Sequence, residues 1–169
     1  MATLDRRDGD GEVLRLVGFR IEDWRFAVRL AQVQTSVMPS QVTRVHHMPP
    51  FVQGIISLRG TIVCVLDLGN LLGLPSSGSA PQRFIVVSAD GAQAAIPVHD
   101  VFRVPDVTAS VVEPQPPSMD ASHREFLTGV INLSTVHGTD RAIGEDTLTV
   151  LDVGALFSSP RIRALRGLR

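Results

Sequence analysis

The sequence predicts an all-β protein with short helical pieces, because its apolar runs are short and because they recur in the same order twice. The runs are bounded mostly by glycine, proline, asparagine or aspartate, and lie at 14–21, 24–33, 42–45, 54–58, 61–66, 83–88, 94–98, 101–104, 129–133 and 147–151. Strands this short, with few segments of helical period, are typical of barrels or a sandwich. Helix is expected only in brief pieces such as 68–72 and 154–157.

The first two runs predict a β-hairpin, because β-branched and aromatic residues alternate on both sides of the polar pair Glu22-Asp23. Residues 75–81 are rich in serine, glycine and proline, and predict the crossover loop between two halves of the chain. Prolines break up the stretch 105–117, which we expect to be extended loop because proline cannot donate to a sheet ladder. A polar insertion at 137–146 is expected to take the place of the tight Arg59-Gly60 turn.

An internal repeat constrains the fold more than any single run. Three blocks of the first half match three blocks of the second in the same order, namely 27–33 with 95–101, 51–58 with 126–133, and 65–72 with 150–157. We therefore expect one β unit used twice, with a first subdomain at about 13–73 and a second at about 82–157. Residues 1–12 are expected to be a disordered leader, and 158–169 an arginine-rich C-terminal tail.

Composition and charge exclude several classes of function. The chain has 169 residues and is 44% hydrophobic, which allows a real core, and its formal net charge of −1 gives no drive toward nucleic acid or an anionic membrane. No apolar run approaches the roughly 18 residues that a spanning helix needs. The single cysteine, Cys64, excludes an internal disulfide. We expect a cytoplasmic protein that neither binds nucleic acid nor inserts directly into a membrane.

The most specific segment runs from Pro50 to Leu68 and reads PFVQGIISLRGTIVCVLDL. It resembles the signature of the CheW-like chemotaxis coupling proteins, in which Gly-Val-x-Asn-Leu-Arg-Gly leads into an apolar strand and then Pro-Val-x-Asp-Leu-Arg. The resemblance covers nearly the whole of 13–157. It implies two small, intertwined, five-stranded SH3-like β-barrels and a non-enzymatic adaptor with no catalytic residue, no metal and no cofactor.

The resemblance also implies partners and a site. The groove between the barrels would take the cytoplasmic tip of a chemoreceptor helical hairpin, an apolar helix face laid in an apolar groove. The positions that match this groove are Leu30, Val33, Thr35, Gly54 and Arg59. A second surface, not assigned to residues, would bind the regulatory domain of a CheA-type histidine kinase, and other CheW-like proteins are further expected partners. On this assignment Gly54→Asp is expected to abolish receptor association and to leave the fold largely intact.

Two residue types in the motif have chemistry that suits an adaptor. Gly54 and Gly60 bracket an apolar strand, and glycine there permits a bend or the close approach of another backbone, which leaves one side of the strand open to a guest. Arg59 at the turn offers a planar fork of donors for carboxylates or carbonyls of a partner. The alternative is that Arg59 pairs internally with Asp67 or another acid, since most arginines at strand ends are solvated or locally paired, and both interpretations can hold together.

Five positions depart from the family pattern, and they are Thr35, Ser57, Cys64, Gly69 and His99. Thr35 stands where the family usually has glutamate, and Gly69 where it has arginine. Losing these charges removes pairs that steer the choice of partner. One alternative is therefore a divergent member that keeps only one partner. Another is a β-barrel interaction module in a different signalling or motility pathway.

An enzyme is the main rival class, because Cys64 with His46, His47 or His99 could make a thiol nucleophile and its base. Cys64 lies inside an apolar strand, where an unpaired cysteine usually behaves as a small buried hydrophobe, so catalysis is disfavoured. Adjacent histidines on a strand point to opposite faces, so His46 and His47 cannot easily hold one metal. Gly9-Asp10-Gly11 has no strand before it and does not predict a phosphate-binding loop.

The tail at 158–169 holds four arginines and has two interpretations. If it is helical, Ile162, Leu165 and Leu168 share a stripe, and the arginines could touch nucleic acid or lipid. A solvated or fraying terminus is the favoured interpretation, since chain ends are often mobile.

Overall fold

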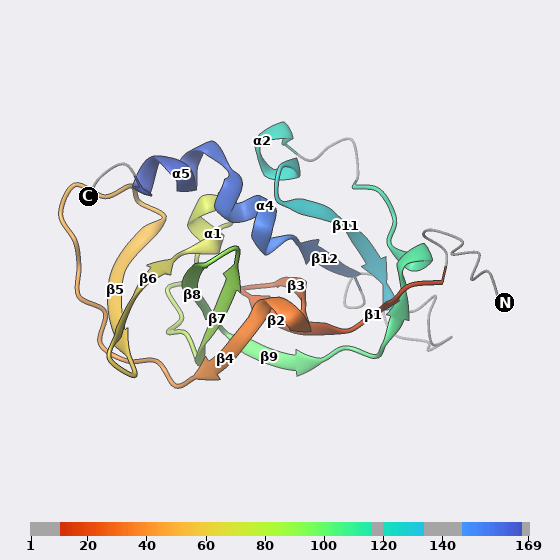
Figure 1. Cartoon of the computed structure of the whole chain (residues 1–169), viewed down its shortest axis with the longest axis horizontal. Coiled ribbons are helices and arrows are strands. Elements are labelled where there is room, and N and C mark those ends of the chain that lie inside the picture. The colour runs from red at the N-terminus through yellow and green to blue at the C-terminus, as the bar shows by residue number, and fades with distance from the viewer. Residues whose placement is uncertain (1–10, 116–119, 134–146, 167–169) are drawn as a thin grey trace, which may run out of the picture.

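Two five-stranded sheets make up most of the molecule, whose computed structural model describes residues 11–115, 120–133 and 147–166 (Figure 1). Sheet I has the strand order β11 (Leu127–Asn132), β12 (Thr147–Leu151), β3 (Trp24–Arg29), β2 (Leu16–Ile21) and β9 (Asp100–Arg103). Sheet II has the order β4 (Val33–Val37), β7 (Arg83–Ala89), β8 (Ala92–Val98), β6 (Thr61–Leu66) and β5 (Val52–Leu58). A further pair joins β1 (Val13–Leu14) to β10 (Val107–Thr108).

The described helices are short. They are α1 (Leu68–Leu71), α2 (Ala121–Arg124), α4 (Val153–Ser158) and α5 (Pro160–Arg166), with two 3-10 turns, η1 (Leu30–Gln32) and η2 (Ala109–Val111). The helical pieces expected at 68–72 and 154–157 are confirmed as α1 and α4. Both begin after an aspartate whose carboxylate accepts a backbone hydrogen bond, from Asn70 to Asp67 at 2.9 Å and from Ala155 to Asp152 at 3.1 Å.

Each sheet closes into a barrel through one backbone bridge between its two edges. In sheet II the edges are β4 and β5, and Thr43, on the chain after β4, exchanges two hydrogen bonds of 2.9 Å with Ile55. In sheet I the edges are β9 and β11, and Glu113 pairs with Val130 at 2.8 and 2.9 Å. We call the two units barrel I and barrel II. The prediction of an all-β fold of two small barrels is confirmed.

The two barrels have the same topology. Sheet I reads β11-β12-β3-β2-β9, and sheet II read from its other edge is β5-β6-β8-β7-β4. The strands of the matching repeat blocks, β11 with β5, β12 with β6 and β3 with β8, therefore take the same places in the two sheets. In both sheets the third strand in this order pairs in parallel with the second, β3 with β12 and β8 with β6. Barrel I combines β2 and β3 from the first repeat with β9, β11 and β12 from the second, and barrel II combines β4, β5 and β6 with β7 and β8. The barrels are therefore intertwined, as predicted.

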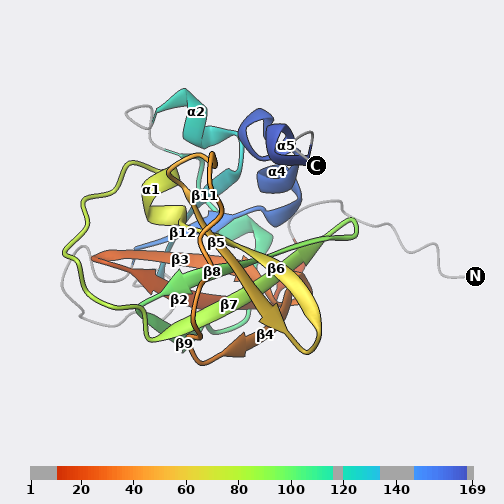
Figure 2. The same cartoon turned by 90° about the vertical axis from the view of Figure 1, so that its left-hand side faces the viewer.

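Three apolar clusters stabilise this arrangement, one inside each barrel and the largest between them. The interbarrel cluster draws on both sheets and on three helices, and it includes Phe19, Val28, Leu68, Ile85, Ile96, Phe157 and Ile162. The rings of Phe19 and Phe26 stack within it with centroids 5.4 Å apart. The helices α1, α4 and α5 lie together on one side of the molecule, where they cover this cluster (Figures 1 and 2).

The expected close approach of a backbone at Gly54 occurs, but the guest belongs to the same chain. Gly54 has φ +147°, and a Cβ there would collide with the carbonyl of Thr43, the residue that closes barrel II. Gly129 holds the same place in barrel I, where a Cβ would lie 2.5 Å from the carbonyl oxygen of Glu113. The expectation that Gly54→Asp leaves the fold intact is therefore wrong, because this glycine permits barrel closure.

The loop predicted at 75–81 is confirmed, since no helix or strand is present between α1 and β7 in this described part of the chain. His99 fastens it to the turn between β2 and β3. The Nδ1 atom of His99 accepts a hydrogen bond from the backbone N–H of Glu22 at 2.9 Å, which leaves Nε2 to donate to the carbonyl of Ser79 at 3.2 Å. A hydrogen bond from Ser77 to the carboxylate of Glu22 lowers the pKa of that carboxyl. The unusual histidine at position 99 thus has a structural role.

The C-terminal segment is a docked helix over 160–166, so the interpretation as a solvated or fraying terminus is wrong for these residues. Ile162 is only 5% exposed in the interbarrel cluster, and Leu165 packs against the same cluster. The guanidinium of Arg161 donates to the carbonyl of Leu71, at the end of α1, at 3.2 Å. The stripe is therefore used for packing. Leu168, and the insertion expected at 137–146, lie outside the described residues.

Candidate docking surface

Arg59 occupies the tip of the hairpin formed by β5 and β6. Leu58 pairs with Thr61, and the two turn residues between them have positive φ, +50° at Arg59 and +81° at Gly60. A two-residue turn of this kind matches the twist of its strands. The side chain of Arg59 is exposed, and it takes part in no ion pair among the residues that the structure describes. Its fork of donors is therefore available to a partner.

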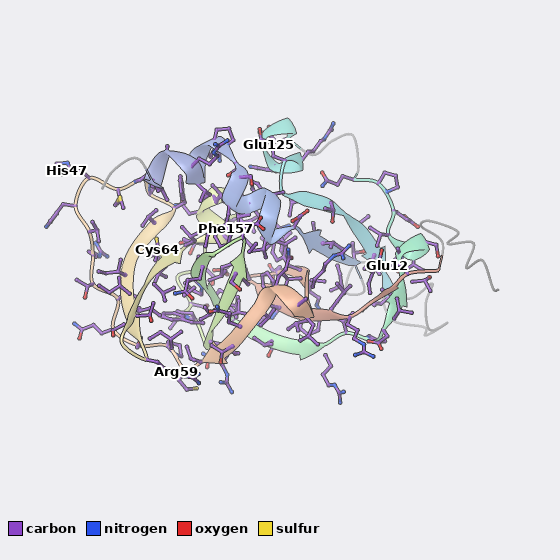
Figure 3. The ribbon with its side chains drawn as sticks, in the orientation of Figure 1. Glu12, His47, Arg59, Cys64, Glu125 and Phe157 are labelled. Carbon is purple, nitrogen blue, oxygen red and sulfur yellow. The ribbon has the colours of Figure 1, made fainter. Side chains whose placement is uncertain are left out.

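Among the described residues, neither Asp67 nor another acid forms an ion pair with Arg59. Asp67 follows the end of β6 that is away from the turn, and its carboxylate accepts hydrogen bonds from the backbone of Asn70 at 2.9 Å and from the amide of Gln53 at 3.1 Å. This carboxylate caps α1 and ties β5 to it. Figure 3 shows Arg59 at the tip of the hairpin, with Cys64 farther along β6.

Leu30, Val33 and Thr35 lie on the segment that leads into and along the edge strand β4. The side chain of Leu30, in η1, is 51% exposed, and its backbone N–H donates to the carbonyl of Arg15 at 2.9 Å. Val33 packs partly against the interbarrel cluster, and Thr35 is half-buried beyond a bulge in the pairing with β7. This segment therefore exposes the side chain of Leu30 and packs the side chain of Val33 partly against the interbarrel cluster.

The structure shows a third part of the surface that the sequence analysis missed. On the β5–β6 hairpin Ser57 pairs with Ile62 and Ile55 pairs with Cys64, so these four side chains share one face, which we call the hairpin face. Ile62 is 69% exposed, and Ile55 and Cys64 are half-buried. The face contains no charged residue. The alternation of 62 and 64 with the buried 63 and 65 could have indicated it, but the run is apolar on both faces.

The predicted site residues therefore divide into two groups. Four of them lie at or near the surface, Leu30, Val33 and Thr35 on the β4 side and Arg59 on the β5–β6 hairpin. Gly54 is buried beneath Thr43 and offers no side chain to a partner. All five belong to barrel II or its entry, and the hairpin face lies between Gly54 and Arg59 along β5. The arrangement suits docking of a protein surface.

The chemistry of Cys64 is that of a packed thiol. Burial raises the pKa of Cys64, so it holds its proton at neutral pH more firmly than a free thiol does. His99, one of its candidate bases, uses both ring nitrogens in the contacts to Glu22 and Ser79. Among the described residues no group of three or more His, Cys, Asp or Glu could hold a metal ion. No helix in the described part of the chain is long and apolar enough to span a membrane.

Alkylation of Cys64 by iodoacetamide is expected to be at least about tenfold slower at pH 7.5 than alkylation of a free cysteine peptide, because only the thiolate reacts. The rate is expected to rise with pH beyond the range in which the peptide reaches its plateau. Mass spectrometry of the intact protein over time measures this. A rate equal to that of the peptide would show that the thiol is not desolvated.

Fold and surface together define a class of protein, an adaptor built of two barrels whose candidate site is a surface for docking another protein. The family model of the CheW-like domain matches residues 15–161, so the chain belongs to the CheW-like family. The prediction of a chemotaxis coupling adaptor of this family is confirmed by that match and by the relatives that follow.

The chain is similar to several curated proteins over most of its length. It is 27% identical to the probable chemotaxis protein CheW of Rhizobium etli, over 92% of this chain and 93% of that protein. It is 26% identical to the protein FrzA of Myxococcus xanthus, over 87% of each. Among solved structures it resembles the scaffolding protein TtCheW of Thermoanaerobacter tengcongensis, with a TM-score of 0.72 and 25% identity over 89% of this chain and 96% of that one.

One of the departures from the family pattern has a visible packing reason. Gly69 is buried in α1, and a Cβ there would lie 3.3 Å from both the Asp67 carboxylate and a methyl group of Ile21. The Cβ of any larger residue at this position would require Asp67 or Ile21, which belongs to the interbarrel cluster, to shift by a few tenths of an ångström. Glycine at 69 therefore allows α1 to pack closely on Ile21 of barrel I.

Proposed function

We propose that this protein couples a chemoreceptor to a histidine kinase in the cytoplasm, and that barrel II docks the cytoplasmic tip of the receptor. The observation that carries the proposal is the combination of an exposed Leu30, an exposed Ile62 and an Arg59 without an internal partner among the described residues. Interfaces are enriched in arginine and exposed apolar anchors of this kind. Relatives named for chemotaxis over nearly the whole chain support the pathway.

Charge reversal at the hairpin tip tests the receptor site. Arg59→Glu is expected to weaken binding of a purified receptor tip fragment by about tenfold or more, because the clamp is lost and a like charge faces the acceptor. Arg103→Glu, the same change at an exposed arginine of β9 in barrel I, is expected to leave the affinity within about twofold. Isothermal titration measures both. Equal losses in the two variants would place receptor binding elsewhere.

A second titration tests the coupling itself. The full chain is expected to bind the regulatory domain of a CheA-type kinase as well as the receptor fragment, and Arg59→Glu is expected to retain the kinase interaction because it lies on a different surface. Binding of the receptor fragment alone would support the divergent adaptor with one partner, which the loss of charge at Thr35 and Gly69 favours. Binding of neither would overturn the proposal and favour an interaction module of another pathway.

A further inference from the structure

Acidic residues are absent from a long part of the sequence that runs from β3 of barrel I through β4, β5 and β6 of barrel II. Of the arginines in this part, Arg25 and Arg29 lie on β3, and Arg44 and Arg59 lie on barrel II. Between Asp23 and Asp67 the chain contains four arginines and two histidines but neither aspartate nor glutamate. No strand of sheet II, including β7 and β8 from the second repeat, contains an acidic residue. The net charge of the whole chain is −1, so the acidic residues are concentrated elsewhere. Barrel II therefore has cationic side chains with few anions to neutralise them.

Exposed apolar side chains gather in the same part of the chain. Six large apolar residues are exposed in the described structure, and five lie between Asp23 and Asp67, namely Trp24, Leu30, Met38, Val45 and Ile62. Surfaces that dock other proteins are enriched in methionine, aromatic residues and arginine, and are poor in aspartate and glutamate. Trp24 lies on β3 of barrel I, and the other four lie on barrel II or its entry. With its exposed methionine, its arginines and its lack of acidic strand residues, barrel II thus matches the composition of an interface with an acidic partner.

Arg44 stands where the loop between β4 and β5 meets the candidate site. It is exposed, and no ion pair involves it in the ranges that the structure describes. Arg44 lines a shallow hollow together with residues that include Val45, Met48 and Pro49. Because Thr43 pairs with Ile55 in antiparallel fashion, Arg44 comes level with Gly54 on β5.

We propose that Arg44 is a second cationic anchor of the docking surface, and that the surface takes an acidic helix whose carboxylates meet Arg44 at one end and Arg59 at the other. The proposal rests on the proposed function and specifies the chemistry of the partner. Along β5, the uncharged hairpin face with the exposed Ile62 lies between the level of Arg44 and the turn at Arg59, and it suits the apolar stripe of the same helix.

The spacing of the anchors defines the pattern that the partner helix must carry. Five residues separate the level of Gly54 from Arg59, which is about 16 Å at roughly 3.3 Å per strand residue. A helix rises about 1.5 Å per residue, so carboxylates about eight to eleven residues apart, on one face, span this distance within the reach of two arginine side chains. Apolar residues on the intervening turns of that face would cover Ile62.

Matched charge reversals test the second anchor. Arg44→Glu is expected to weaken binding of the receptor tip fragment by about tenfold, as reversal of an interface charge does when a carboxylate faces it. Arg83→Glu changes the charge equally at an exposed arginine of β7 and is expected to alter the affinity by less than about twofold. Wild-type affinity is expected to fall with added salt more steeply than that of Arg44→Glu, because one ion pair has been removed. Both variants are expected to have the same midpoint of thermal unfolding as the wild type.

A synthetic helical peptide separates failure of this inference from failure of the proposed function. The peptide carries glutamates two and three turns apart beside a stripe of leucines, and its counterpart has glutamine at those positions. Arg44-dependent binding of the glutamate peptide without receptor binding would overturn the proposed function and sustain the acidic-helix site. Receptor binding that is unaffected by Arg44→Glu would overturn the second anchor and leave the function standing. Equal affinity for the glutamate and glutamine peptides would also overturn the second anchor.

Discussion

Replacing Gly54 by aspartate is expected to lower the free energy of unfolding by about 3 kcal/mol or more, because a side chain there combines backbone strain with a collision. The residue has φ +147°, which side-chain-bearing residues rarely adopt, and its missing Cβ makes room for the carbonyl of Thr43. That carbonyl accepts the 2.9 Å hydrogen bond from Ile55 that closes barrel II. Urea unfolding followed by circular dichroism measures the loss. Receptor binding is expected to fail with the fold.

Gly60→Asn is the matched control for this variant. Gly60 also has a positive φ, +81°, but a Cβ there would meet no atom within 4 Å. Asparagine tolerates this conformation, so the expected loss is below about 1 kcal/mol. If Gly54→Asp were as stable as wild type and had lost only its partner, the close approach of Thr43 would not be needed for folding.

Removal of residues 160–169 is expected to destabilise the protein by about 3 kcal/mol, since α5 buries Ile162 at 5% exposure and contributes one hydrogen bond to α1. For a chain of this size the midpoint of thermal unfolding should fall by about 6–12 °C. Calorimetry measures the shift. The point variant Ile162→Ala is expected to reproduce most of it, because it leaves a cavity in the interbarrel cluster.

Arg163→Ala is the control for α5. This side chain is exposed on the helix and is expected to change the midpoint by less than about 2 °C. If the chain that ends at Ser159 had the same midpoint of thermal unfolding as the full-length protein, α5 would add nothing to the stability of the core.

The sequence was informative where the local pattern and the packing agree. Short apolar runs between turn residues gave the strands, and the brief helical pieces expected at 68–72 and 154–157 are α1 and α4. Strands that come from matching repeat blocks take the same place in the two sheets, β3 with β8, β5 with β11 and β6 with β12, because matching blocks have apolar residues at the same positions. The glycine before the hairpin strand indicated a close backbone approach, which occurs at both Gly54 and Gly129.

What the sequence could not supply is which segments meet. A repeat does not say whether its strands pair within one copy or across copies, and the structure joins β3 to β12 and β6 to β8 across them. The same difficulty misassigned Gly54, since nothing local says that the approaching backbone is Thr43 and not a partner. The helical interpretation of the tail was not favoured because the interbarrel cluster that receives Ile162 and Leu165 draws on both halves of the chain, and no local pattern indicates that cluster.

Part of the candidate site was accessible from the sequence and part was not. The motif identifies Arg59 through its place in a tight turn, and the structure leaves that arginine exposed. Ile62 lies in an apolar run that could face inward at every position, so only the pairing with Ser57 shows that its side chain points outward. Arg44 follows Thr43 in a loop without periodicity, and its relation to β5 depends on one long-range bridge.

The exchange of strands between the barrels has a consequence for synthesis of the chain on the ribosome. The β2–β3 hairpin is complete after residue 29, but the parallel neighbour of β3 is β12, at Thr147–Leu151. In barrel II, β6 likewise cannot pair with its parallel neighbour until β8 has been synthesised. The nascent polypeptide thus carries an unfinished apolar sheet edge at β3 until Thr147–Leu151 have emerged. This pairing is expected to form late, because contacts between distant segments form slowly.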